Sequence, residues 1–478
     1  MRTINLTQRS KGNVLLHDLF EGGLETQVLT EHRPEPAERA SFTIPGLDLS
    51  APQTFNSLNG QYHFWNWRDL EGTDVGRVDL ARALVIPMRY VVLEGEKDTH
   101  VVVSDRLDKM IGAVNSLDDL RSTEFHYTYP KMVPANTVVQ VTFDLEEGQA
   151  KYRDAKTVRY IEPAPQPADI RAIGEAYGNV VFRAVKGFMS QVPQGEEIGI
   201  GLSGGADSGL VYMFANKALR ELGRDPQTLR AFTLKIGEGG KDVEQARRLV
   251  EFLHEKVYKT RNQWEVLGIS RDALPTLEDA VAMMEDYKTT HDLQDVMVSM
   301  AFKKALRERH PDLKFMLDGQ GGDELCQDYN VEETGVTLQE VLTNPHLFVE
   351  GRSHLPGRIS EMFSGGLSRR VTRDYNPNAV YGFQGFSPIC TTEVIRLMYG
   401  TPKAELSEGT EQGLYGLKIA FANAAAEAVT GFQYSFPQKN RFQRGASDTE
   451  TRSGLEAESN ETRARALFNE RMESLMKR

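Results

Sequence analysis

Hydrophobic positions in the first third of the chain follow the spacing of β-strands. Short runs of β-branched residues lie between turn-forming residues, and this alternation is typical of half-buried strands. The predicted strands are 90–93, 100–103 and 137–143. We expect the aromatic side chains Phe64, Trp65 and Trp67 to pack beneath them. The pattern therefore predicts a β-rich N-terminal part.

Beyond the proline-rich segment 162–167 the apolar spacing changes, and helices alternate with strands. The predicted elements are a helix at 170–188, a strand near 197–201, a strand at 230–236, helices at 242–253 and 293–308, a strand at 313–317 and an amphipathic helix near the C-terminus. Such alternation indicates an α/β unit with a doubly wound parallel sheet. The proline-rich segment predicts a division into domains 1–162 and 168–478.

Composition narrows the classes of partner. The 478 residues are 40% hydrophobic and 26% charged, as in an ordinary globular protein too long for one core. A formal charge of −12 argues against general affinity for nucleic acid. Two cysteines and the lack of a long apolar run indicate a cytoplasmic protein without a membrane partner.

We expect the acidic stretch 278–286 to be a solvated helix face.

The most informative motif is the loop 201–208, Gly-Leu-Ser-Gly-Gly-Ala-Asp-Ser, which lies between a predicted strand and a predicted helix. Glycines let the backbone approach an anion, and N–H groups at a helix start bind phosphate oxygens. The alternative is a tight turn with an Asp/Ser cap. No P-loop lysine or G-x-G-x-x-G pattern is present in the loop. The expected nucleotide contacts here are Leu202, Ser203, Gly204, Gly205, Asp207 and Ser208.

A second glycine loop, 318–324 (Asp-Gly-Gln-Gly-Gly-Asp-Glu), follows the predicted strand 313–317. Alone it would be read as a turn. Both loops, however, follow strands of one predicted sheet, and ligands bind at the carboxyl ends of such strands. We expect Gly321 to contact the nucleotide, and Asp207 and Asp323 to share Mg²⁺ across its phosphates. The sequence thus predicts a site for a nucleotide with its metal.

Residues 203–208 resemble the pyrophosphate loop of the ATP pyrophosphatases. Together with 318–324 they resemble the S-G-G-x-D-S and S/T-G-x-G-S-D-E motifs of the asparagine synthetase family, which includes the β-lactam synthetases. That family also has a pair of lysines late in its sequence. In this chain Lys418 resembles the first of them, and Lys439, followed by Phe442 and Gly445, resembles the second. Weaker likenesses at 58–65 and 104–106 extend into the first part. The resemblance implies an N-terminal glutaminase-like (Ntn-type) domain and a C-terminal adenine nucleotide α-hydrolase-like domain.

The same resemblance implies an ATP-dependent ligase that adenylates a small-molecule carboxylate and passes it to ammonia or an amine, releasing AMP and pyrophosphate. Lys439 would neutralise charge on the phosphate or on the tetrahedral intermediate, and Lys418 would contact pyrophosphate. The implied cofactors are ATP and Mg²⁺. A homodimer is compatible with this assignment.

Two features depart from the family pattern. Arg2 follows Met1 where glutamine-dependent members have a catalytic cysteine, and Cys326 lies in the second half. We therefore expect a vestigial first domain and no use of glutamine. The second departure is that Gln320 replaces a glutamate or tyrosine, and Gln384 replaces a glutamate. A glutamine side chain can orient an amine but cannot accept a proton as a base. This weakens the case for aspartate as substrate and for lactam closure by the tyrosine and glutamate that β-lactam synthetases use.

Several alternatives stay open at this point. The first is intramolecular lactam closure in natural-product or antibiotic biosynthesis, since that branch also keeps a degenerate first domain. Transfer of sulfur through an adenylate is a second alternative, and the lack of paired cysteines argues against it. A non-catalytic scaffold is a third, and the intact loop 203–208 with Asp323 and Lys439 argues against it.

Overall fold

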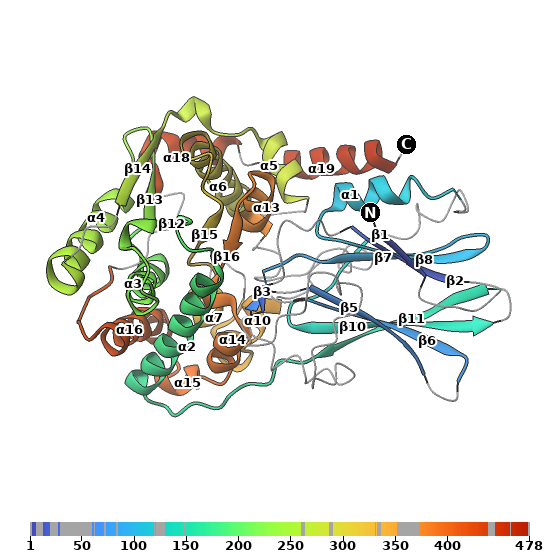
Figure 1. The fold of residues 1–478 in the computed structure, drawn as a ribbon, viewed down its shortest axis with the longest axis horizontal. Helices are drawn as coiled ribbons and strands as arrows, with labels where there is room; N and C mark the ends of the chain where they lie inside the picture. The colour runs from blue at the N-terminus through green and yellow to red at the C-terminus, as the bar shows by residue number, and fades with distance from the viewer. Residues whose placement is uncertain are drawn as a thin grey trace.

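The N-terminal unit, at the right of Figure 1, consists of two larger sheets stacked face to face. Their strand orders are β1-β2-β8-β7-β9 and β11-β10-β6-β5, and β3 and β4 form a small third sheet. The strands are β1 (Arg2–Asn5), β2 (Asn13–Asp18), β3 (Gln27–Val28), β4 (Gly60–Gln61), β5 (His63–Asp69), β6 (Val75–Arg82), β7 (Arg89–Glu94), β8 (Asp98–Ser104), β9 (Lys131–Met132), β10 (Thr137–Glu146) and β11 (Gln149–Arg159), with one helix, α1 (Leu107–Val114).

This computed structural model describes most of the chain. The described residues are 2–5, 13–19, 27–28, 60–61, 63–70, 73–82, 85–118, 120, 130–146, 149–259, 263–285, 290–329, 331, 336–350, 372–437, 445–458 and 460–476. Among these residues, no helix has both the length and the apolar character needed to cross a membrane.

Side-chain alternation builds the core between the two sheets. Val101 and Val103 of β8 point into this core, whereas Val102 between them points to the opposite face and packs beneath α1. Strands β7, β8 and β10 confirm the predicted strands 90–93, 100–103 and 137–143. The aromatic prediction is correct in part: Trp65 and Trp67 pack in this core. Phe64 faces away from it, because neighbouring residues of β5 point to opposite faces.

The C-terminal unit is built on one parallel sheet of order β14-β13-β12-β15-β16. Its strands are β12 (Ile198–Gly201), β13 (Leu229–Ile236), β14 (Gln263–Ile269), β15 (Phe315–Leu317) and β16 (Gln384–Phe386). Its helices are α2 (Ile170–Gln191), α3 (Ala206–Glu221), α4 (Asp242–Phe252), α5 (Leu277–Met284), α6 (Thr290–Arg309), α7 (Gly322–Cys326), α9 (Leu338–Thr343), α10 (Leu347–Glu350), α13 (Thr372–Val380), α14 (Thr392–Tyr399), α15 (Lys403–Leu406), α16 (Glu411–Thr430), α18 (Thr449–Glu458) and α19 (Glu461–Met476). The predicted α/β class with a doubly wound sheet is confirmed.

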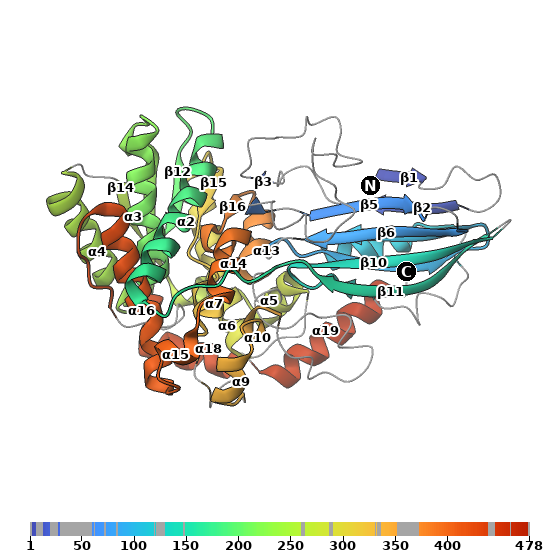
Figure 2. The same ribbon diagram turned by 90° about the horizontal axis from the view of Figure 1, so that it is seen from below.

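Helices cover both faces of this sheet, as Figures 1 and 2 show. One core contains residues of α2, α3 and α16, and the other contains residues of α5, α6 and α19. In β13, Ala231 belongs to the first core and its neighbour Phe232 to the second. Strand β13 is therefore buried on both sides, which explains its largely apolar sequence.

The strand order reverses between β12 and β15, which are neighbours in the sheet. From β12 the chain proceeds outward through β13 to β14, and β15 and β16 then lie on the other side of β12. A ligand-binding crevice forms at such a reversal point, beyond the carboxyl ends of the strands. The two glycine loops follow β12 and β15, so the topology places both at this point.

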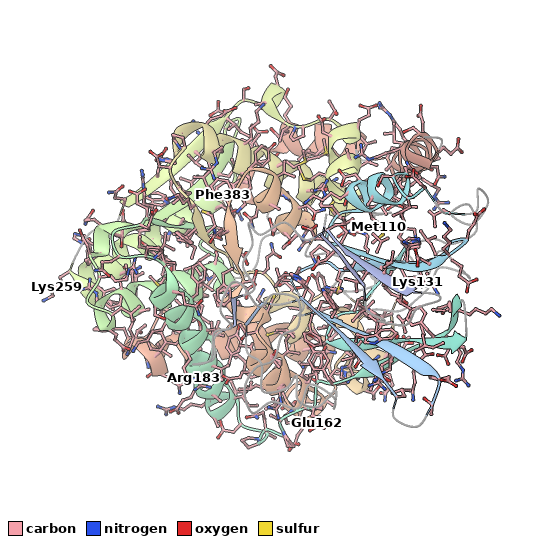
Figure 3. The ribbon with its side chains drawn as sticks, turned by 45° about the vertical axis from the view of Figure 1, so that its right-hand side comes forward. Met110, Lys131, Glu162, Arg183, Lys259 and Phe383 are labelled. Carbon is pink, nitrogen blue, oxygen red and sulfur yellow. The ribbon has the colours of Figure 1, made fainter. Side chains whose placement is uncertain are left out.

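The proline-rich segment packs against the C-terminal unit. The backbone N–H of Ala164 donates to the carbonyl of Arg396 at 2.9 Å, and that of Gln166 donates to the carbonyl of Gly400 at 3.0 Å. Figure 3 shows Glu162 at the lower edge of the molecule. The division into 1–162 and 168–478 stays a prediction.

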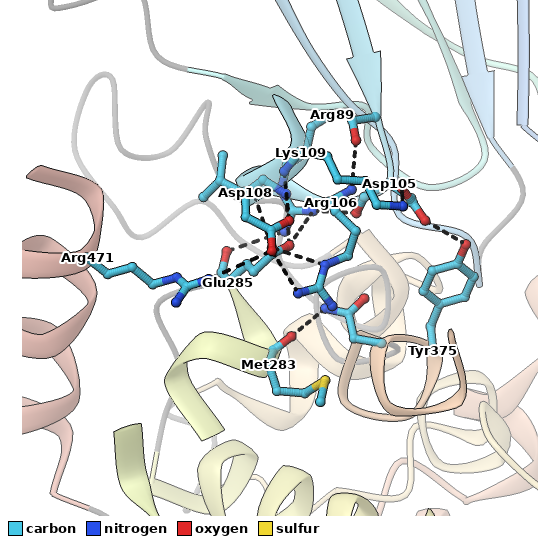
Figure 4. Close-up of polar contacts among 12 residues, drawn as sticks. Arg89, Asp105, Arg106, Asp108, Lys109, Met283, Glu285, Tyr375 and Arg471 are labelled. Atoms are coloured by element: carbon cyan, nitrogen blue, oxygen red, sulfur yellow. Dashed lines mark hydrogen bonds and ion pairs between the residues drawn. The ribbon is translucent and has the colours of Figure 1, made fainter. Parts of the chain in front are cut away.

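A buried carboxylate joins the two units (Figure 4). Glu285, at the C-terminal end of α5, accepts hydrogen bonds from the Nε of Arg106 at 3.1 Å and from the backbone N–H groups of Leu107 and Asp108 at 2.8 and 3.2 Å. The guanidinium of Arg89 lies 3.8 Å from the same carboxylate. The expectation that 278–286 forms a solvated face is therefore wrong for Glu285, because its carboxylate caps the first turn of α1 in the other unit.

Candidate active site

The first glycine loop forms a sharp turn from β12 into the N-terminus of α3. Gly204 has a φ of +78°, and a Cβ there would lie 2.4 Å from the backbone nitrogen of Ala246. Glycine is therefore required by both conformation and space. The hydroxyls of Ser203 and Ser208 are hydrogen-bonded at 2.9 Å, and the N–H of Ser203 donates to Ser208 Oγ at 3.2 Å. These contacts hold the loop around the start of a helix whose dipole favours an anion.

The second glycine loop lies directly against the first. A Cβ on Gly319 would be 2.6 Å from the backbone nitrogen of Ser208, and one on Gly322 would be 2.1 Å from a carboxylate oxygen of Asp207. Gly321 has a φ of +97°, a conformation that other residues rarely adopt. Absence of side chains at these positions allows the two loops to touch.

Lys418 of α16 brings the carboxylates of both loops together. Its Nζ lies 2.5 Å from Asp207, forms a short ion pair with Asp323, and is 3.7 Å from Asp328. The lysine is only 4% exposed. Burial lowers the pKa of Lys418, but the neighbouring carboxylates outweigh burial and raise that pKa well above its usual value. Lys418 is thus a fixed positive charge at the meeting point of the loops.

The carboxylates of Asp207 and Asp323 fit the magnesium site that the sequence predicts. Both converge on one cation, so their oxygens lie close together. Magnesium in nucleotide sites is held by one or two carboxylates together with phosphate oxygens. Within the described part of the chain, no cluster of three or more His, Cys, Asp or Glu side chains is arranged to hold a metal by itself. Phosphate oxygens would therefore complete the coordination, and the magnesium assignment stays a prediction.

The other predicted nucleotide contacts are placed as follows. The N–H of Leu202 donates to the carbonyl of Phe232 at 2.8 Å and is already used within the sheet. The N–H of Gly205 donates to Ser203 Oγ at 3.3 Å, a long contact that a phosphate oxygen can replace. Lys439 and Phe442 lie outside the described residues, and the role of Lys439 stays a prediction.

Gln320 extends from the second loop toward α13. Its side-chain amide donates to a carboxylate oxygen of Asp374, and Ser299 Oγ donates to the other oxygen of Asp374 at 2.6 Å. The Sγ of Cys390 donates to the backbone carbonyl of Gln320 at 3.2 Å. A cavity opens here, lined by Val85, Asp318, Gln320, Asp374, Tyr375, Asn378, Gly385 and Ser387.

Sequence reasoning gave Asp318 no role and did not single out Asp374 or Asn378, which line the same cavity. Asp318 could have been recognised from the sequence, because it begins the second glycine loop at a position where the resembled family has Ser or Thr. Asp374 and Asn378 belong to α13, which the fold alone brings beside that loop.

Neither cysteine is suited to act as a nucleophile. Cys326 and Cys390 are both buried and form no disulfide. Burial raises the pKa of the Cys326 thiol to about 12 and that of the Cys390 thiol well above its usual value. The thiolate is the reactive form, so both side chains stay protonated and unreactive at neutral pH.

The contact between the loops predicts the effect of one methyl group. Gly322→Ala places a Cβ against the Asp207 carboxylate and should separate the loops, at a cost of about 1–3 kcal/mol in unfolding free energy. In Gly416→Ala of α16, the added methyl meets nothing within 4 Å, and about 0.4–1 kcal/mol of stabilisation is expected. Urea unfolding of both variants measures these differences in stability. Equal unfolding midpoints for the two variants would show that the glycine loops are not in close contact at Gly322.

Comparison with known proteins agrees with this geometry. Residues 183–376 match the family model described as asparagine synthase. The matched region is less than half of the chain. The match contains both glycine loops and Asp374, and it ends before Lys418.

No curated protein matches the chain. Among solved structures, the NH3-dependent NAD synthetase of Campylobacter jejuni subsp. jejuni NCTC 11168 is 18% identical, with a TM-score of 0.22 over 34% of this chain and 61% of that one. The U34-tRNA thiolase NcsA of Methanococcus maripaludis is 14% identical, with a TM-score of 0.27 over 63% of this chain and 80% of that one. The chain thus spans less than two thirds of the NAD synthetase.

Proposed function

We propose that the protein is an ATP-dependent amide ligase that splits ATP into AMP and pyrophosphate. It adenylates a small-molecule carboxylate and passes the acyl group to ammonia or to an amine of the substrate. The observation that carries this proposal is the convergence of Asp207, Asp323 and Lys418 where the two glycine loops meet. A fixed cation and paired carboxylates beside a helix N-terminus suit a triphosphate with its metal.

Each group has a defined task in this proposal. Ser203, Gly204, Gly205 and Ser208 surround the departing pyrophosphate. Magnesium bound by Asp207 and Asp323 would supply charge neutralisation on the phosphates. Lys418 holds the two carboxylates in place and adds positive charge that is oriented before the reaction begins, which is usually the largest contribution in such catalysis.

Ammonia or a substrate amine, rather than glutamine, supplies the nitrogen. Hydrolysis of glutamine by this class of enzyme requires a reactive thiolate, and burial keeps the thiols of Cys326 and Cys390 protonated. We therefore propose that the N-terminal unit is a vestigial glutaminase-like domain that contributes packing.

Pyrophosphate release over a panel of amino and dicarboxylic acids tests the function. Each acid is incubated with ATP and Mg²⁺ in three parallel reactions, with ammonium, with glutamine, and without added amine. We expect AMP and pyrophosphate in equal amounts, with ammonium supporting turnover and glutamine failing to do so. Turnover without added amine would instead assign intramolecular ring closure. Formation of ADP, or equal support by glutamine, would contradict the proposal.

A further inference from the structure

The cavity beside the second glycine loop is rich in hydrogen-bond acceptors. The carboxylates of Asp318 and Asp374 line it, together with the amide of Asn378. Asn378 is 4% exposed, and its Oδ1 is buried without a hydrogen-bond partner. A buried oxygen without a partner costs about 1–3 kcal/mol. A ligand that donates hydrogen bonds would remove this cost, so the cavity is suited to a donor.

The charges around the cavity also favour a cationic occupant. Lys303 is buried, with 4% of its surface exposed. Its positive charge interacts with the carboxylates of both Asp374 and Asp318. Arg373, next in the chain to Asp374, directs its guanidinium to Asp295 at 2.6 Å instead. Two carboxylates thus face one lysine, and an ammonium group in the cavity would balance the remaining negative charge.

We propose that this cavity binds the amine nucleophile in its ammonium form, and that Asp318 is the catalytic base that removes the first proton. This inference rests on the proposed function and adds the site of the amine to it. Asp318 lies two residues before Gln320 in the same loop, and its carboxylate accepts the Gln320 backbone N–H at 3.0 Å. A carboxylate is therefore present beside the glutamine that cannot accept a proton.

The surroundings of Asp318 suit a base that works near neutrality. Burial in the protein and, after it, the neighbouring Asp374 carboxylate raise the pKa of Asp318, which reaches about 6. A base whose pKa lies near the working pH is the most effective, because it is ionised and still binds a proton. The geometry of the cavity and its acceptor lining carry the inference independently of this shift.

The proposed step balances in protons and electrons. Asp318 takes one proton from the ammonium, and the nitrogen lone pair then forms the C–N bond to the carbonyl carbon of the acyl-adenylate. The bond from that carbon to the phosphate oxygen breaks, and AMP leaves with its electron pair. The surplus proton on nitrogen passes to Asp374, the second carboxylate of the cavity. The products are the amide, AMP and two protonated carboxyl groups.

Ammonium and hydroxylamine distinguish this role from a general loss of activity. Hydroxylamine is largely uncharged at neutral pH, so it attacks an acyl-adenylate without a cation site or a base. The test compares the wild type with Asp318→Asn, and with Asp318→Ser as a second variant in case the first does not fold. Asp312→Asn, an exposed residue before the same strand, is the matched control. The acid used is the best substrate in the panel described above.

We expect Asp318→Asn to lower ammonium-dependent amide formation by about 100-fold or more. Hydroxamate formation should stay within about threefold of the wild type, and the Asp312→Asn control should change neither. If the substrate carries its own amine, turnover without ammonium should fall by the same large factor.

Two results would overturn the inference, and they are distinguishable. Equal losses of amide and hydroxamate, or full amide formation in both Asp318 variants, would exclude Asp318 as the base while leaving the ligase assignment intact. A wild-type protein that makes neither product with any acid would remove the proposed function and this inference with it.

Discussion

Replacing Lys418 by methionine is expected to lower pyrophosphate release by about 100- to 1,000-fold, the usual cost of removing one oriented group from such a site. The variant loses the charge on which Asp207 and Asp323 converge, so the two loops repel each other. Asp207→Asn and Asp323→Asn should cause comparable losses, because each removes a predicted magnesium ligand. Initial rates of pyrophosphate release with saturating ATP and Mg²⁺ measure the effect.

Lys403→Met is the matched control for this prediction. Lys403 is also 4% exposed, but its Nζ donates to the carbonyl of Met398 at 2.7 Å rather than to a carboxylate of the loops. Burial lowers the pKa of Lys403 to about 8. Its removal should lower stability while leaving pyrophosphate release nearly unchanged in the folded fraction. A folded Lys418→Met protein with near wild-type release would refute the proposed nucleotide site.

The second large effect is expected at the contact between the units. Glu285→Gln should lower the free energy of unfolding by about 3–5 kcal/mol, because Arg106 and Arg89 would keep buried charges without their carboxylate. Burial raises the pKa of Glu285 to about 7 and so opposes its ionisation, whereas Arg106 and Arg89 favour it. The comparison therefore belongs at a pH above 7, where the carboxylate is ionised and the arginines of the variant lack their partner. Urea unfolding followed by circular dichroism gives the difference.

Glu278→Gln provides the control on the same helix. Glu278 pairs with Arg463 at 2.9 Å, and both side chains are more than half exposed, so its loss should cost at most about 1 kcal/mol. Similar unfolding midpoints for the two variants would show that the buried pair does not stabilise the contact between the units.

The glycine loops could be predicted because the chain encodes them locally. The positive φ values of Gly204 and Gly321, and the helix that begins within each loop, follow from residues within a few positions. Their adjacency follows from the alternation of helices and strands, which places parallel strand ends at one edge. Lys418 was found through its resemblance to a family motif, since it lies far from both loops in the sequence.

The remaining features depend on contacts between distant segments. Glu285 stands in an acidic stretch that resembles a solvated face, and only the position of α1 shows that its carboxylate is buried. Asp374 and Asn378 line the cavity because α13 packs beside the second loop. Phe64 was assigned to the wrong core because the register of β5 could not be read from three neighbouring aromatic residues.

The position of Val85 has a consequence for engineering the protein. This residue follows β6 in the N-terminal unit, yet it forms part of the lining of the acceptor-rich cavity. A shortened chain without the first unit would admit water to that cavity, where an acyl-adenylate is readily hydrolysed. On the proposed function, the first unit is therefore retained because it protects a labile intermediate, and its inner surface is a place to alter nucleophile choice.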